Sequence, residues 1–99
     1  MSSLPLRRPN ALPPSDSPEL ELLVERVLAW YAMPREEALV ALGIWARCTD
    51  AEIAEWLGWT VAQVEERFRH CCTVLRPLGL GTRVGAGEAV VRAMSGAGW

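Results

Sequence analysis

Most of the side chains suited to specific recognition lie in one segment, residues 60–76, and Arg83 follows it. Gln63 carries an amide that can pair with an adenine edge, and Arg69 carries a guanidinium that can contact guanine or a backbone phosphate. A glutamate such as Glu66 can accept a hydrogen bond from a cytosine amino group. The candidate set for contacts with duplex DNA is Thr60, Gln63, Glu66, Arg67, Arg69, His70, Thr73, Arg76 and Arg83. The alternative interpretation is a solvated face of mixed charge.

A second group of arginines could bind phosphates without reading sequence. The candidates are Arg7, Arg8, Arg35, Arg47, Arg76 and Arg83. Arg7 and Arg8 belong to residues 1–17, which are rich in proline and serine and are expected to form a disordered, extended arm. Such an arm could lie along a DNA groove. The favoured interpretation is a terminus without a role.

The remaining reactive residues form no catalytic or metal-binding pattern. The chain has one histidine, one tyrosine and no lysine, and no nucleophile has a base at a workable spacing. Cys48, Cys71 and Cys72 lack a Cys-x-x-Cys spacing and are expected to be buried thiols. Successive helical residues point about 100° apart, so residues 70–72 cannot easily converge on one ion. We therefore expect no enzyme, no metal and no cofactor.

Two adjacent helix-start signals must position the candidate recognition residues. Thr49 with Glu52, and Thr60 with Gln63, each match the capping box, in which two side chains satisfy backbone N–H groups at the start of a helix. Gly58 lies between them, where the first helix must end and a residue without Cβ adopts the left-handed conformation cheaply. Apolar residues recur at three-or-four spacing in both segments. The pattern predicts a helix-turn-helix over residues 49–76.

The rest of the chain also reads as helical. Ser17, Pro18 and Glu19 predict a helix start, and this helix should run to about Ala32. A second helix should begin near Pro34 and end near Arg47, and Pro77 should stop the recognition helix at or before Arg76. A last helix is expected from Val84 to Met94, although a winged-helix variant would instead form a hairpin from residues 78–91.

Length and composition indicate one small domain. The chain has 99 residues, of which about half are apolar and five are tryptophan, so a packed globule is favoured over a disordered chain. We predict an all-α fold, with a single helical domain over residues 18–99. No signal peptide or membrane span is visible, so a cytoplasmic location is expected. The net charge of −2 is unusual for a protein that neutralises phosphates.

The first predicted helix has apolar residues on more than one side. Leu20, Leu22, Leu23, Val24, Val27, Leu28, Trp30 and Tyr31 are too many for a single face of a solvent-exposed helix. One side can pack on the domain, and the other favours a second copy of the chain. A compact monomer that buries both sides is the alternative.

From Pro34 onward the order of these features resembles the DNA-binding domain of the LuxR/NarL/GerE class of bacterial regulators. Residues 33–37 resemble that family's helix opening, residues 50–57 its scaffold helix, and residues 60–64 the start of its recognition helix. Leu78-Gly79-Leu80, Thr82-Arg83-Val84 and Ala86 resemble the segment that leads into its fourth helix. The resemblance implies a tetrahelical domain, here preceded by one additional helix. In that family the third helix enters the major groove, and many members dimerise through the fourth.

The chain departs from the family pattern within the recognition helix. Glu65, followed by Glu66, stands where a basic residue is usual, Arg67 stands where a histidine is common, and about three extra residues precede Leu78. The leading hypothesis is a small sequence-specific DNA-binding transcriptional regulator with a recognition helix at about 61–75. It would act as a homodimer through its N-terminal or C-terminal helix. The alternative is a helix-turn-helix-derived protein–protein interaction module, an adaptor or modulator of the transcription machinery with little or no DNA binding.

Overall fold

The computed structural model describes residues 12–96, and within them every regular element is helical. The elements in chain order are α1 (Pro18–Trp30), α2 (Arg35–Trp45), α3 (Asp50–Leu57), α4 (Val61–Leu75), the 3₁₀ turn η2 (Arg76–Leu78) and α5 (Arg83–Gly96). The prediction of an all-α domain is therefore confirmed. Residues 78–91 contain no strand, so the winged-helix alternative is wrong.

The hairpin alternative fails because residues 82–85 form the capped start of α5. The Oγ1 of Thr82 accepts a hydrogen bond from the backbone N–H of Gly85 at 2.9 Å, which caps the first turn of α5. A Cβ on Gly85 would lie only 2.4 Å from the carbonyl oxygen of Leu80. Gly85 is thus what lets the first turn of α5 lie against the preceding turn.

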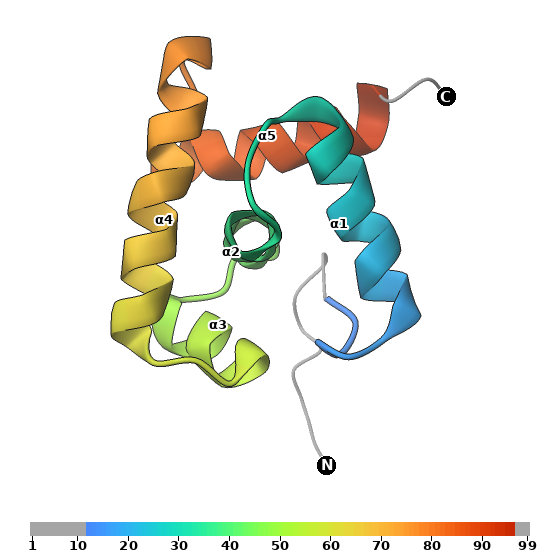
Figure 1. The fold of residues 1–99 in the computed structure, drawn as a ribbon, viewed down its shortest axis with the longest axis vertical. Coiled ribbons are helices and arrows are strands. Elements are labelled where there is room, and N and C mark those ends of the chain that lie inside the picture. Colours follow the sequence, from blue (N-terminus) through green and yellow to red (C-terminus); the bar gives the residue numbers. More distant parts are fainter. Residues whose placement is uncertain (1–11, 97–99) are drawn as a thin grey trace.

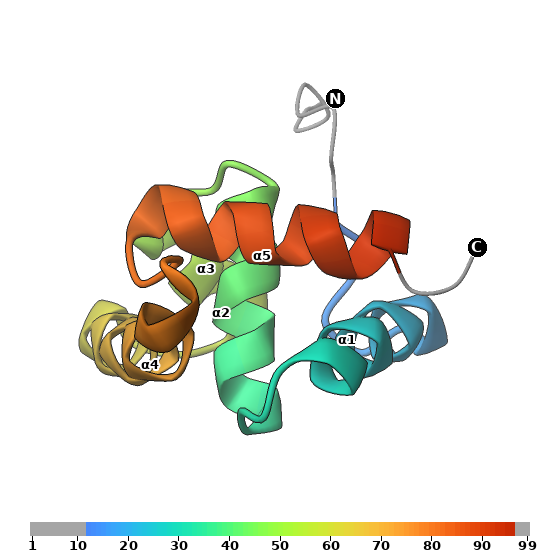
Figure 2. The ribbon, with the colours of Figure 1, turned by 90° about the horizontal axis from the view of Figure 1, so that it is seen from above.

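Helix α2 forms the centre of the domain. It packs against α1, α3, α4 and α5, and Figure 1 shows it end-on among them. Every residue from Glu37 to Ile44 is buried. Figure 2 shows α5 crossing α2. The largest fully buried side chains come from all five α-helices and include Leu20, Leu42, Ile53, Leu75 and Val90. One core therefore holds the domain together.

The helix-turn-helix is present with both of its predicted capping boxes. The Oγ1 of Thr49 accepts from the N–H of Glu52 at 3.1 Å, and the Oε1 of Glu52 accepts from the N–H of Thr49 at 2.8 Å. Thr60 and Gln63 repeat this arrangement with the same two distances. Gly58 ends α3 with a φ of 73°, in the left-handed region.

A close approach between α2 and α3 orients this unit on the core. The buried side chain of Ile53 occupies the space that a side chain at Gly43 would need. A Cβ at Gly43 would lie 2.6 Å from the Cγ1 of Ile53. The glycine therefore sets how near α3 lies to the central helix.

Residues 12–17, which the sequence analysis placed in the arm, lie against the domain. The backbone carbonyl of Pro13 accepts a hydrogen bond from the indole Nε1 of Trp56 at 3.0 Å, and Leu12 packs against the core. Ser17 caps α1, as predicted. Arg7 and Arg8 lie outside the described residues.

Helix α1 buries one side and exposes the other. Leu20, Val24 and Val27 are buried, whereas Leu22 is 61% exposed. The hydroxyl of Tyr31, just after the helix, donates to the carbonyl of Ala89 in α5 at 2.9 Å. The helix thus belongs to the core, and part of its apolar surface still faces solvent.

Candidate nucleic-acid interface

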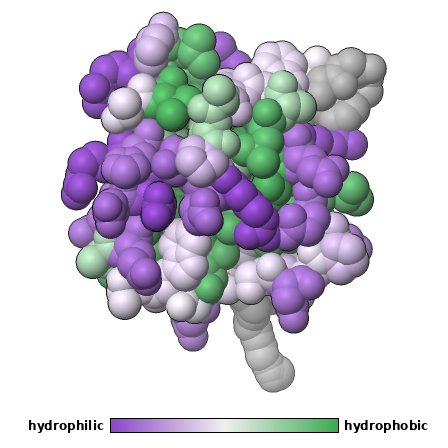
Figure 3. Space-filling view, in the orientation of Figure 1, coloured by the Kyte–Doolittle hydropathy of each residue, from purple (hydrophilic) through white to green (hydrophobic). Residues whose placement is uncertain are grey.

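Helix α4 presents a polar stripe to solvent. Val64, Cys71 and Leu75 are fully buried, which fixes the inward side of the helix. The exposed residues of the opposite side are Ala62, Gln63, Glu66, Arg69, His70 and Thr73. Figure 3 shows hydrophilic residues gathered over the α4 side of the molecule. Most of the candidate residues of α4 therefore lie on its outward side, whereas Arg67, also expected there, is half-buried.

One candidate side chain, His70, lies beside a buried carboxylate, and the charge of another, Arg67, acts on that carboxylate. Glu37 of α2 is 3% exposed, and its Oε2 lies 3.6 Å from the Nδ1 of His70. Its Oε1 has no hydrogen-bond partner among the described residues. Burial raises the pKa of the Glu37 carboxyl, while the charges of His70 and Arg67 act to lower it. His70 and Arg67 thus interact with the domain itself and are less available to a ligand.

Sequence reasoning missed Glu37 because it follows Glu36 near the start of a helix, where acids commonly face water. The spacing between Glu37 and the buried residues that follow it is the signal that could have identified it. Position 37 lies four and seven residues before Ala41 and Ile44, on a face that is buried throughout. A carboxylate on that face has to find a partner in a neighbouring helix.

The side chains of Thr60 and Gln63 are already engaged in hydrogen bonds of the capping box. The Oγ1 of Thr60 accepts from the backbone N–H of Gln63, and the Oε1 of Gln63 accepts from the backbone N–H of Thr60. Pairing with adenine requires both the oxygen and the nitrogen of the amide. In this arrangement Gln63 offers only its Nε2 group, so a two-point contact with adenine would require the capping box to open.

Two predicted phosphate contacts are held in ion pairs. The Nη1 of Arg83 lies 2.8 Å from the Oδ1 of Asp50, and its Nη2 donates to the carbonyl of Cys48 at 2.8 Å. Arg35 pairs with Glu21. Arg83 therefore joins the start of α5 to the start of α3 through an ion pair, and Arg35 joins α2 to α1 in the same way.

Arg69 and Arg76 are the exposed α4-side arginines whose guanidinium groups make no hydrogen bond or ion pair with residues 12–96. Arg69 lies on the outward stripe, and Arg76 directly follows α4. The hydroxyl of Thr73 donates to the backbone carbonyl of Arg69 at 3.2 Å and leaves the guanidinium free. These two residues are therefore the strongest of the predicted contacts.

The cysteines behave as structural thiols. Cys71 and Cys72 are buried, as predicted, and Cys48 is half-buried. Burial raises the pKa of the Cys71 thiol to about 12. Within residues 12–96 no three histidine, cysteine or acidic side chains are grouped so that they could hold a metal ion. None of the described helices is long and apolar enough to cross a membrane.

No family model, curated protein or solved structure matches this chain. The similarity to the LuxR/NarL/GerE class therefore rests on the motifs alone and stays a prediction.

Proposed function

We propose that this chain is a small sequence-specific DNA-binding regulator that reads the major groove with α4. The observation that carries this proposal is the exposed polar stripe on the second helix of a doubly capped helix-turn-helix. A helix of this kind is narrow enough for the major groove of B-DNA. The chain would act in the cytoplasm, where bacterial regulators meet DNA.

The roles follow from which side chains are free. Arg69 would contact guanine or a phosphate, and Arg76 would contact a phosphate at the end of the helix. Glu66 lies on the same stripe as Arg69 and would be repelled by phosphates, so its favourable partner is a cytosine amino group. The stripe thus combines one phosphate-seeking group with one base-reading group.

Two copies of the chain would place two α4 helices in successive major grooves, about 34 Å apart. Leu22 on α1 is an exposed apolar residue on one of the two helices that the sequence favours for dimer contacts. Sedimentation of the chain over a range of concentrations tests this part of the proposal.

A protein–protein interaction module is the second candidate, and charge favours it. Residues 49–76 carry five acidic and three arginine side chains. Arg83 neutralises one of these acids, Asp50, and Arg35 is paired with Glu21, so neither arginine is free to neutralise a phosphate. DNA affinity depends strongly on neutralised phosphates, so an acidic helix-turn-helix would bind DNA weakly.

Selection from a pool of random duplexes at low ionic strength, followed by titration at rising salt, separates the two functions. A DNA reader should enrich one sequence and should lose affinity steeply between about 50 and 200 mM salt. An adaptor should enrich none and should show no useful binding even at the lowest salt.

A further inference from the structure

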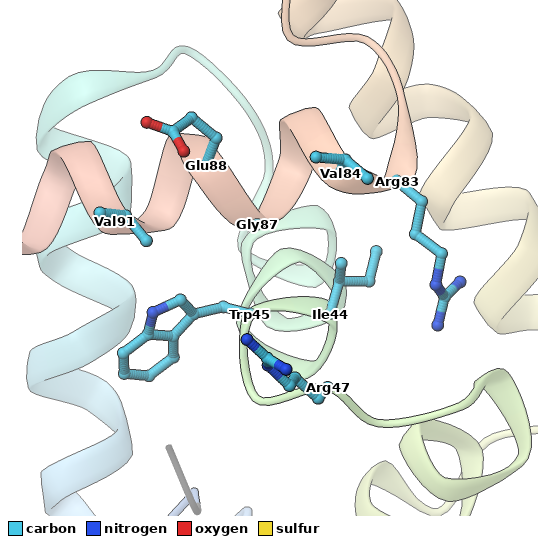
Figure 4. Close-up of a pocket in the computed structure, with 8 residues that line it drawn as sticks. All are labelled: Ile44, Trp45, Arg47, Arg83, Val84, Gly87, Glu88 and Val91. Atoms are coloured by element: carbon cyan, nitrogen blue, oxygen red, sulfur yellow. The ribbon is translucent and has the colours of Figure 1, made fainter. Parts of the chain in front are cut away.

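A groove runs between the end of α2 and the first half of α5, with a volume of about 430 Å³. Ile44 and Trp45 line it from α2, Val84 and Val91 from α5, and Arg47 from the turn after α2 (Figure 4). No residue of α4 contributes to it. An occupant would therefore leave the outward stripe of α4 free.

The walls of this groove combine apolar and charged side chains and are open to solvent. Val84 is 84% exposed and Val91 is 44% exposed, although both are branched aliphatic side chains. Between them Gly87 contributes no side chain, and a Cβ there would meet only Trp45 and Ile44 at ordinary distances of 3.8 and 3.9 Å. The fold therefore does not require glycine at this position, and the missing side chain deepens the groove.

One cation at the edge of the groove lacks an internal partner. The other charged lining residues are paired, Arg83 with Asp50 and Glu88 with Arg92. Arg47 is exposed, and its guanidinium makes no hydrogen bond or ion pair with residues 12–96. Its φ of 68° lies in the left-handed region, where a glycine would be the favoured residue at the end of a helix. An arginine is thus present at a position where the backbone disfavours it.

The shape and charge of the groove limit what can occupy it. A small molecule is usually enclosed over most of its surface, and a wall as exposed as Val84 does not provide this. A symmetric contact between two copies of the groove would bring the arginines of both copies to one interface, where like charges repel. A peptide segment fits better, because its apolar side chains can fill the groove while a carboxylate meets Arg47.

We propose that this groove docks a short apolar segment of a partner protein, and that a carboxylate of the segment pairs with Arg47. The site lies apart from α4 and goes beyond DNA reading. The partner would bind a regulator whose recognition helix is still available.

The test uses a displayed library of short random peptides, selected on the full chain and counter-selected on Val84→Asp. This substitution changes an almost fully exposed side chain, so the fold should be retained, and the added carboxylate repels an acidic peptide. The expected consensus has two apolar residues at three-or-four spacing and one Asp or Glu. Wild-type affinity for the consensus peptide should fall about tenfold when its acid is changed to the amide.

A second variant isolates the charge. Arg47→Gly keeps the turn, because glycine suits the left-handed backbone, and removes the cation. On this variant the acidic peptide and its amide should bind equally. Arg69→Ala, on α4, serves as the control and should bind the peptide like wild type. The control also keeps this test independent of DNA reading, because Arg69→Ala should weaken DNA binding and leave peptide binding unchanged.

Three outcomes would overturn the proposal. The first is a selection that enriches no peptide family. The second is an enriched family that binds Val84→Asp or Arg47→Gly as tightly as wild type. The third is a concentration-dependent dimer that Val84→Asp dissociates, which would assign the groove to a second copy of the chain.

Discussion

The Oε2 of Glu37 lies 3.6 Å from the Nδ1 of His70, so a buried residue of the central helix meets an exposed residue of the proposed recognition helix. Burial raises the pKa of Glu37, and the folded chain therefore keeps this proton at pH values where the unfolded chain, with a pKa near 4.5, has lost it. The stabilising contribution of this group is fully present below pH 4.5 and is lost as the pH rises through the raised pKa.

Glu37→Gln should therefore flatten the dependence of stability on pH. We expect its thermal midpoint at pH 7 to equal or exceed that of wild type, because the buried charge is gone and an amide can still contact His70. Thermal unfolding followed by circular dichroism from pH 4 to 8 measures this. Glu55→Gln changes an exposed acid of α3 whose charge is not among those that act on Glu37, and it should leave the profile as in wild type. A clearly lower midpoint for Glu37→Gln at pH 7 would contradict the prediction.

Two glycines in α5 should respond in opposite ways to alanine. Gly87→Ala should raise the free energy of unfolding by roughly 0.5–1 kcal/mol, because alanine favours helices and its Cβ meets no close neighbour. Gly85→Ala should lower it by about 1–3 kcal/mol, because its Cβ would overlap the Leu80 carbonyl. Urea unfolding of both variants makes the comparison. Equal effects at the two positions would show that the start of α5 is placed differently.

Arg47→Gly should stabilise the chain by up to about 1 kcal/mol, because it relieves a left-handed backbone conformation at a non-glycine residue. Arg47→Ala is the matched control, since it removes the same charge and keeps the Cβ, and it should bring no such gain. The measurement is the urea midpoint at fixed pH. A gain for both variants would assign the effect to the charge and not to the backbone.

Thr60→Ala should cost about 1 kcal/mol of stability, because it removes the hydroxyl that caps the start of α4. Thr60→Ser retains that hydroxyl and should cost little. Thermal unfolding of the two variants measures these changes in stability. If Thr60→Ala left the stability unchanged, the capping box would contribute little to the stability of α4.

Arg69→Ala should weaken duplex binding by about 1–3 kcal/mol without changing stability, because its guanidinium has no partner within residues 12–96. Arg67 is less suitable for this test, since its charge acts on the buried Glu37. Arg92→Ala, at an exposed position on α5, is the control and should bind DNA like wild type. Titration of the selected duplex by fluorescence anisotropy compares them. Unchanged binding by Arg69→Ala would show that another surface contacts DNA.

The parts of the fold that the sequence predicted best depend on neighbours three residues apart. Both capping boxes and Gly58 are local signals, and the structure has α3 and α4 where those signals placed them. The position of Pro77 likewise limited α4 to Leu75. The Glu37–His70 contact and the Arg83–Asp50 pair join residues 33 positions apart, and no local pattern specifies either of them.

At the candidate site, too, the sequence predicted local features and missed contacts between residues distant in the chain. Sequence periodicity identified the outward stripe of α4, because it needs only the spacing of buried residues. Periodicity could not show that Gln63 hydrogen-bonds to Thr60. Nor could it show that Arg83 forms an ion pair with Asp50. The groove beside Trp45 was missed for a related reason. Its lining comes from two helices and a turn that only the folded chain brings together.

Helix α2 has no free side between Glu37 and Ile44, and it contacts all four other α-helices. A change of volume at one of these positions therefore cannot be absorbed by moving into water. It has to shift a neighbour, and the available neighbours include both the helix proposed to read DNA and the helix that walls the groove. Sequence variation in this protein should accordingly be least tolerated along this central segment, even though none of its side chains between Glu37 and Ile44 lies on the outer surface.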